Sequence, residues 1–85
     1  MRITYDPDVD AAYIYLSETI GDGEATHTYG CDPAEVGGMI NLDFDDHGRM
    51  LGIEVMDASH HLPEQLLKDA EILKPAPRHT TAKAK

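Results

Sequence analysis

The chain has 85 residues and a formal net charge of −9, because 16 acidic residues outnumber 7 lysines and arginines. This length fits one domain, and 41% hydrophobic residues fit an ordinary globular protein. The single cysteine excludes an internal disulfide and a thiolate-rich zinc site. The acidic balance argues against binding to nucleic acids or anionic membranes, since both attract clustered lysine and arginine.

Acidic residues are concentrated in the first two thirds of the chain. Residues 1–57 hold 13 acids and 2 bases, whereas residues 58–85 hold 3 acids and 5 bases. We predict one domain over residues 1–73 and a basic, disordered tail over residues 74–85, where apolar residues are too few to pack. No apolar run approaches the ~20 residues that cross a bilayer. The opening MRITYDPDVD lacks the apolar stretch of an export signal, which with the lone thiol predicts a cytoplasmic protein.

Alternating polar and apolar residues predict about five strands, at residues 2–5, 11–16, 24–29, 39–44 and 50–57. Most are joined by short turns, which favour antiparallel pairing. The stretch GCDPAEVGG, residues 30–38, has three glycines and a proline and is expected to form a loop. Alternation places Leu51, Ile53 and Val55 on the core face of the last strand.

After Asp57 the apolar spacing changes to that of a helix. Asp57 is a suitable N-cap for a helical turn over residues 58–61, and Pro63 fits the first turn of a longer helix. The apolar stripe of that helix would consist of Leu62, Leu66, Ala70 and Leu73. The predicted fold is therefore α+β: an antiparallel, meander-like sheet of about five strands, with one C-terminal helix packed on one face.

Two sequence blocks resemble a known family. The opening ITYDPDVDAAYIYL and the later block DDHGRMLGIEVMDAS, residues 45–59, are similar to the YuzE-like family of small bacterial domains of unknown function. The resemblance covers residues 2–59, and the chain departs from the family pattern over residues 29–38. It implies a compact sheet-plus-helix domain and carries over no catalytic or cofactor residue. Some members of that family look as if they are encoded beside small toxin-like proteins, so the resemblance implies an antitoxin or binding role.

One segment has the ligand spacing of a calcium loop. Asp43, Asp45, His47 and Glu54 stand at ligand positions, and Gly48 stands at the position of the loop glycine. Strands rather than helices flank this segment, so we interpret it as a hairpin turn with exposed carboxylates.

Two further groups of residues carry side chains suited to metal or thiol chemistry. His60 and His61 could join Asp57, or Cys31 and His27, in a mixed metal site. Adjacent helical histidines point about 100° apart, so we interpret them as a solvated or capping pair. Acidic surroundings disfavour the thiolate form of Cys31.

No catalytic, cofactor-binding or metal-binding residue is assigned from the sequence. A functional surface is expected instead, consisting of Asp10, Tyr13, Glu54, Asp57 and His60. We expect a non-enzymatic, antitoxin-like module whose acidic surface binds another protein, such as a small basic toxin. The alternative is a protein that binds a divalent metal or a small ligand. A core limited by chain length and a sheet with exposed edges also predict a homodimer.

Overall fold

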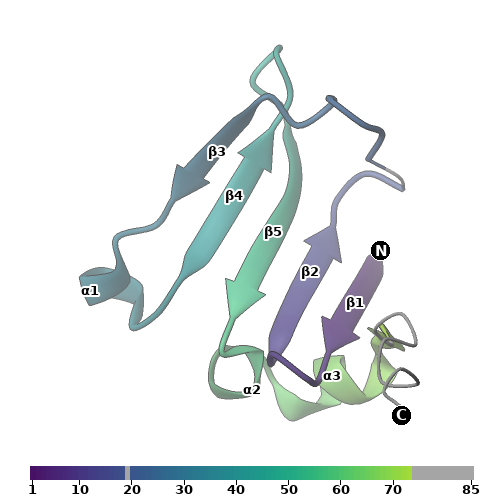
Figure 1. The fold of residues 1–85 in the computed structure, drawn as a ribbon, viewed down its shortest axis with the longest axis vertical. Helices are drawn as coiled ribbons and strands as arrows, with labels where there is room; N and C mark the ends of the chain where they lie inside the picture. The colour runs from purple at the N-terminus through teal and green to yellow at the C-terminus, as the bar shows by residue number, and fades with distance from the viewer. Residues whose placement is uncertain (19, 74–85) are drawn as a thin grey trace, which may run out of the picture.

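The structure is a computed structural model and describes residues 1–18 and 20–73. These residues form one sheet and three short helices (Figure 1). In chain order the elements are β1 (Arg2–Asp6), β2 (Ala11–Tyr15), β3 (His27–Gly30), α1 (Pro33–Val36), β4 (Ile40–Phe44), β5 (Met50–Met56), α2 (Ala58–His61), α3 (Glu64–Asp69) and β6 (Glu71–Ile72). The tail predicted over residues 74–85 lies outside the described residues.

The sheet has six strands in the order β3-β4-β5-β2-β1-β6. All neighbours are antiparallel except β1 and β6, which are parallel. The α+β class is confirmed, but the prediction of a five-strand antiparallel meander is wrong. After the β4–β5 hairpin the chain returns to β2, so that β5 lies between β4 and β2, and a sixth short strand follows the helices.

The single C-terminal helix expected after Asp57 is also wrong, because the chain breaks at Leu62. Leu62 ends α2 with φ −115° and ψ 147°, the extended conformation that a residue before proline favours. Pro63 then precedes α3, which extends only over Glu64–Asp69. The helical turn predicted over residues 58–61 is therefore α2, whereas the single longer helix predicted after it is the short α3.

Strand pairing ends α3 before its predicted last turn. Ala70 is already extended, with φ −71° and ψ 151°. Ile72 then pairs with Tyr5 of β1, and the Leu73 N–H donates to the Tyr5 carbonyl at 2.8 Å. These backbone hydrogen bonds to β1 replace those of a further helical turn, a competition that helical periodicity does not reveal.

The expected loop over residues 30–38 contains helix α1, whose ends carry clear local signals. The Asp32 carboxylate accepts the Ala34 N–H at 2.9 Å, and Pro33 occupies the first helical position. Gly37 ends the helix in the left-handed region at φ 79°. By contrast, Asp57 does not cap α2 as predicted: its own φ is 51° and its side chain makes no cap hydrogen bond.

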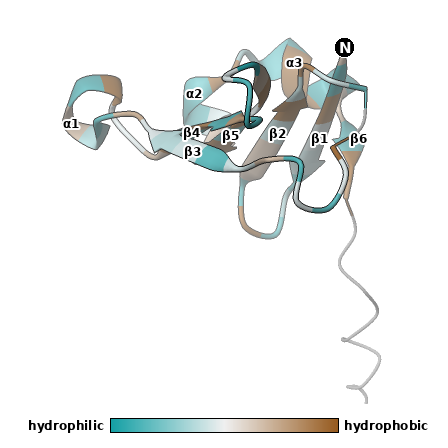
Figure 2. Cartoon of the chain, turned by 90° about the horizontal axis from the view of Figure 1, so that it is seen from above, coloured by the Kyte–Doolittle hydropathy of each residue, from teal (hydrophilic) through white to brown (hydrophobic). Residues whose placement is uncertain are grey.

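The core lies on the face of the sheet that α2 and α3 cover (Figure 2). Its fully buried members are Ala12 of β2, Val55 of β5 and Ala58 of α2. Half-buried apolar side chains pack around them, namely Tyr5, Ile40, Ile53, Leu62 and Leu67. The predicted core assignment of Val55 is confirmed, and helices on one face leave the other face of the sheet to polar residues.

Candidate functional site

The face of the sheet opposite α2 and α3 carries no helix within the described residues (Figure 2). Strand register aligns its side chains in two rows that cross the strands. One row is Arg2, Tyr15, Gly52, Asp43 and Thr28, and the other is Thr4, Tyr13, Glu54 and Asn41. We call these nine residues the open face, although Thr4 and Gly52 are themselves buried by their neighbours.

Tyr13, Asp43 and Thr28 form a hydrogen-bonded chain across four strands of the open face. The Tyr13 hydroxyl donates to Asp43 Oδ2 at 2.6 Å, and the Thr28 hydroxyl donates to Asp43 Oδ1 at 2.7 Å. The Tyr13 ring lies directly over Gly52, where any Cβ would collide with it. Burial, reinforced by the bond to Asp43, raises the pKa of Tyr13 above its ordinary value, so the hydroxyl remains a donor at neutral pH.

Glu54 lies beside Tyr13 and retains acceptor capacity. The two residues are directly opposite each other in the β2–β5 pairing. Asn41 Nδ2 donates to Glu54 Oε1 at 2.9 Å, while Oε2 accepts no hydrogen bond from a described side chain. The open face therefore offers a carboxylate oxygen next to an aromatic ring.

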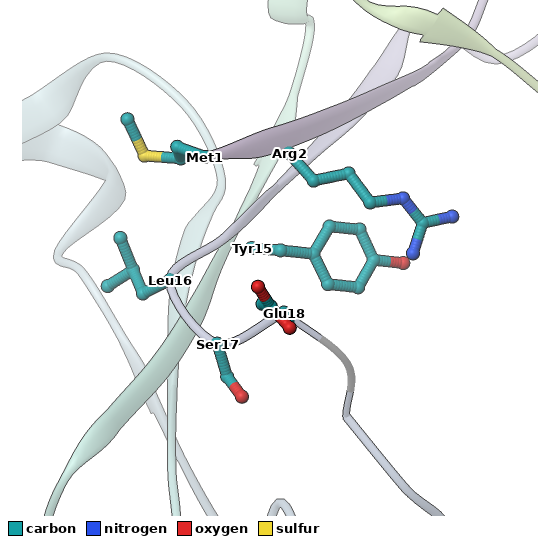
Figure 3. A pocket seen from close by; sticks show the side chains of 6 residues that line it. All are labelled: Met1, Arg2, Tyr15, Leu16, Ser17 and Glu18. Atoms are coloured by element: carbon teal, nitrogen blue, oxygen red, sulfur yellow. The ribbon is translucent and has the colours of Figure 1, made fainter.

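Arg2 and Tyr15 occupy the end of the open face near the start of β1. The Tyr15 ring meets the Tyr13 ring edge-on, with centroids 4.8 Å apart. The Arg2 guanidinium carbon lies 4.6 Å from the Tyr15 ring centroid, and Arg2 Nε donates to Glu71 at 3.1 Å. A pocket opens here, lined also by Met1, Leu16, Ser17 and Glu18 (Figure 3). The protein thus places one of its own cations on an aromatic ring of this face.

Asp10 belongs to a separate cluster at the opposite end of β2. It accepts hydrogen bonds from the Ser59 N–H at 3.0 Å, the Ser59 hydroxyl at 2.7 Å and the Tyr5 hydroxyl at 2.7 Å. The bonds from Ser59 and Tyr5 hold the pKa of Asp10 below its ordinary value. Asp10 therefore connects the β1–β2 turn to the start of α2.

The structure divides the predicted functional surface in two. Tyr13 and Glu54 are adjacent on the open face. Asp10, Asp57 and His60 lie instead around the start of α2, where Asp10 is committed to Ser59 and Tyr5. The five residues do not form one site.

The carboxylates of the calcium-like segment point to different partners. Asp43 is engaged by Tyr13 and Thr28, and Glu54 by Asn41. Asp45 is only 6% exposed, which corrects its assignment as an exposed turn group. In the described parts of the chain, no three residues of the types His, Cys, Asp and Glu gather closely enough to hold a metal ion.

Asp45 instead organises the β4–β5 hairpin. Its Oδ1 accepts the N–H groups of His47 and Arg49 at 2.8 and 2.9 Å, and its Oδ2 accepts Arg49 Nε at 2.8 Å. These bonds, led by the Arg49 backbone, hold the pKa of Asp45 below its ordinary value. Gly48 completes the turn at φ 79°, as expected from its place in the hairpin.

His61, the second of the two adjacent histidines, lies against backbone carbonyl groups. His61 Nδ1 lies 3.0 Å from the Asp57 carbonyl oxygen and its Nε2 lies 3.2 Å from that of Gly37. The ring packs against Gly38, where a Cβ would come within 2.7 Å of it. His61 therefore connects α2 to the end of α1.

Sequence reasoning missed six members of the open face: Arg2, Thr4, Tyr15, Thr28, Asn41 and Gly52. Alternation alone could place Arg2 and Asn41 on polar faces, but it does not tell which strands are neighbours. Gly52 carried a usable signal, since an isolated glycine inside a strand pattern suggests that another group approaches closely.

Comparisons with known proteins assign the chain to a family. No curated protein and no solved structure matches it. Within residues 1–18 and 20–73, no helix has both the length and the apolar content of a membrane span. Residues 2–59, well over half of the chain, match one family. The chain belongs to the family described as "Protein of unknown function (DUF2283)".

Proposed function

We propose that this protein is a non-enzymatic binding module whose open face holds a basic segment of another protein. The observation that supports this most is the position of Arg2, whose guanidinium already stacks on Tyr15 at 4.6 Å. A lysine or arginine from a partner would find a similar environment at Tyr13, with Glu54 beside it. The YuzE-like resemblance favours an antitoxin-like form of this role, with a small basic toxin-like partner in the cytoplasm.

The chemistry of the open face suits recognition of a cation. The face of a tyrosine ring attracts ammonium and guanidinium groups by about 0.5–1 kcal/mol at exposed sites. Glu54 has an oxygen free of described donors, which can accept a charge-assisted hydrogen bond. The net charge of −9 would attract a basic partner before contact.

The hydrogen bonds among Tyr13, Asp43 and Thr28 favour a role in binding over a role in proton transfer. Asp43 accepts one side-chain hydrogen bond at each of its oxygens, and the raised pKa of Tyr13 keeps its hydroxyl protonated. Both groups are thereby held in place. A rigid set of side chains on strands is the arrangement that a binding surface needs, because little side-chain freedom is lost on association.

A titration with acetyl-tetra-arginine amide, followed by amide NMR shifts, tests the proposal. We expect the largest shifts at Tyr13, Tyr15 and Glu54, and weaker binding as salt is added. Glu54→Gln should weaken binding at least threefold. The matched control is Asp46→Asn, which removes the same charge from the exposed hairpin, away from the open face.

Two results would contradict the proposal. Shifts that gather away from the open face would assign binding to another surface. Equal losses in Glu54→Gln and Asp46→Asn would show that only overall charge matters. Affinity capture from the native host with the intact protein, compared with Glu54→Gln, would then identify the partner by its loss from the variant.

A further inference from the structure

Strand β3 forms one edge of the sheet among the described residues, and every one of its four residues is exposed. Its inner side pairs with β4, and no described strand lies against its outer side. We propose that a second copy of this chain pairs with this outer edge, so that two sheets join across a two-fold axis. This inference does not depend on the binding role of the open face.

The hydrogen-bond pattern shows which backbone groups the edge presents. The Cys31 N–H donates to the carbonyl of Ile40, its direct neighbour across the β3–β4 pair. Backbone groups alternate in direction along an antiparallel strand. The N–H and C=O groups of Thr28 and Gly30 therefore point away from β4 and can pair with another strand.

Apart from its length of only four residues, this edge lacks the features that normally prevent pairing. Proteins protect edge strands with charged side chains, prolines, bulges or very short strands. The sequence of β3, HTYG, contains no proline and no acidic or permanently charged residue. Tyr29 on this strand is 62% exposed, and Val36 and Met39 are exposed nearby in the chain. The opposite edge, β6, has only two residues.

A second copy is the occupant that the geometry favours. A two-fold axis beside β3 sets the strand antiparallel to the same strand of the second copy. Thr28 of one copy then faces Gly30 of the other, and Tyr29 faces Tyr29. The apolar Tyr29 side chains would then lie close to each other across the new pair. Because this edge is short, the dimer should depend on concentration rather than be permanent.

Charge gives this contact a distinctive salt dependence. Each copy has a net charge of −9, so two copies repel each other, while β3 itself contributes no acidic residue. Added salt screens that repulsion and should strengthen the dimer. Binding of a basic segment to the open face should weaken with salt. The two proposals can therefore fail independently.

Thr28→Pro and Thr28→Val form a matched pair of test variants. Both lose the hydroxyl that donates to Asp43, but only proline removes the outward N–H. Proline is tolerated where the N–H of an edge strand faces solvent, so the β3–β4 pairing should survive. Sedimentation velocity from about 10 µM to about 1 mM covers the weak affinities expected of a small interface.

We expect the wild-type protein and Thr28→Val to dimerise, more strongly at higher salt, and Thr28→Pro to dimerise at least tenfold more weakly. In the wild-type protein, hydrogen exchange at the Thr28 and Gly30 amides should slow as concentration rises. This second measurement decides the matter if Thr28→Pro does not fold. A monomer at all concentrations, equal dimerisation of the two variants, or protection at other amides would overturn the proposal.

Discussion

Two aspartates adopt a backbone conformation that is unusual for residues other than glycine, and the segments that contain them are hydrogen-bonded to each other. Asp10 has φ 55° and Asp57 has φ 51°, both in the left-handed region that aspartate tolerates better than most residues. The Ala58 N–H donates to the Asp10 carbonyl at 2.9 Å, and Ser59 binds the Asp10 side chain. The bend after β1 and the bend after β5 thus hold each other in place.

Asp45 holds the β4–β5 hairpin together, so its replacement should lower the stability of the protein. Asp45→Ala removes the acceptor of two backbone N–H groups in a buried position, and we expect it to lower the melting temperature by several degrees. Asp45→Asn should cost less, because an amide oxygen can still accept both backbone donors. Thermal unfolding followed by circular dichroism measures both, with Asp46→Asn as the exposed control. Similar melting temperatures for all three variants would contradict the role of Asp45 in the hairpin.

The lowered pKa values of Asp10 and Asp45 predict a loss of stability in acid. Each carboxylate has a lower pKa in the folded state than in the unfolded chain. Its contribution is therefore fully present above the unfolded value of about 4 and is lost as the pH falls through the folded value. We expect urea midpoints to be constant near neutral pH and to fall below about pH 4. The double variant Asp10→Asn, Asp45→Asn should show a smaller fall, and an unchanged fall would contradict this assignment.

At the scale of the elements, the two faces of β5 should respond differently to truncation. Ile53 packs against the core cluster, whereas Met56 lies on the opposite face of the strand. We expect Ile53→Ala to cost about 2 kcal/mol, near the lower end for such truncations because Ile53 is half-buried. Met56→Ala should cost clearly less. Urea denaturation of both variants measures this, and equal costs would mean that the polar face is buried as well.

Local patterns predicted the main strands and their faces, because alternation along one strand depends on nearby residues only. The same patterns could not predict that β5 pairs with β2, since that choice depends on competition among distant strands. They also missed β6, whose two residues are held by β1 rather than by their own propensity. The helix signals around Asp32 and Gly37 were present in the sequence but were outweighed by the glycines near them.

The candidate site was only partly predictable for the same reason. Tyr13 and Glu54 were selected from the sequence, and the structure places them side by side. Their link to Asp43 and Thr28 depends on the strand order β3-β4-β5-β2, which no local pattern contains. Asp10 was selected too, but its bonds to Ser59 assign it to the support of α2 rather than to the open face.

For the whole molecule, the dominant electrostatic term should be repulsion among its acidic residues. Residues 1–57 hold 13 acids and only 2 bases, and one of those bases, Arg49, is paired with Asp45. Salt screens exposed charges that are more than about 8–10 Å apart at moderate ionic strength, so added sodium chloride should raise the melting temperature. Calcium at matched ionic strength should add little, because Asp43, Asp45 and Glu54 have separate partners. A saturable rise with calcium, abolished in Asp45→Asn, would contradict this and would indicate a metal site at the hairpin.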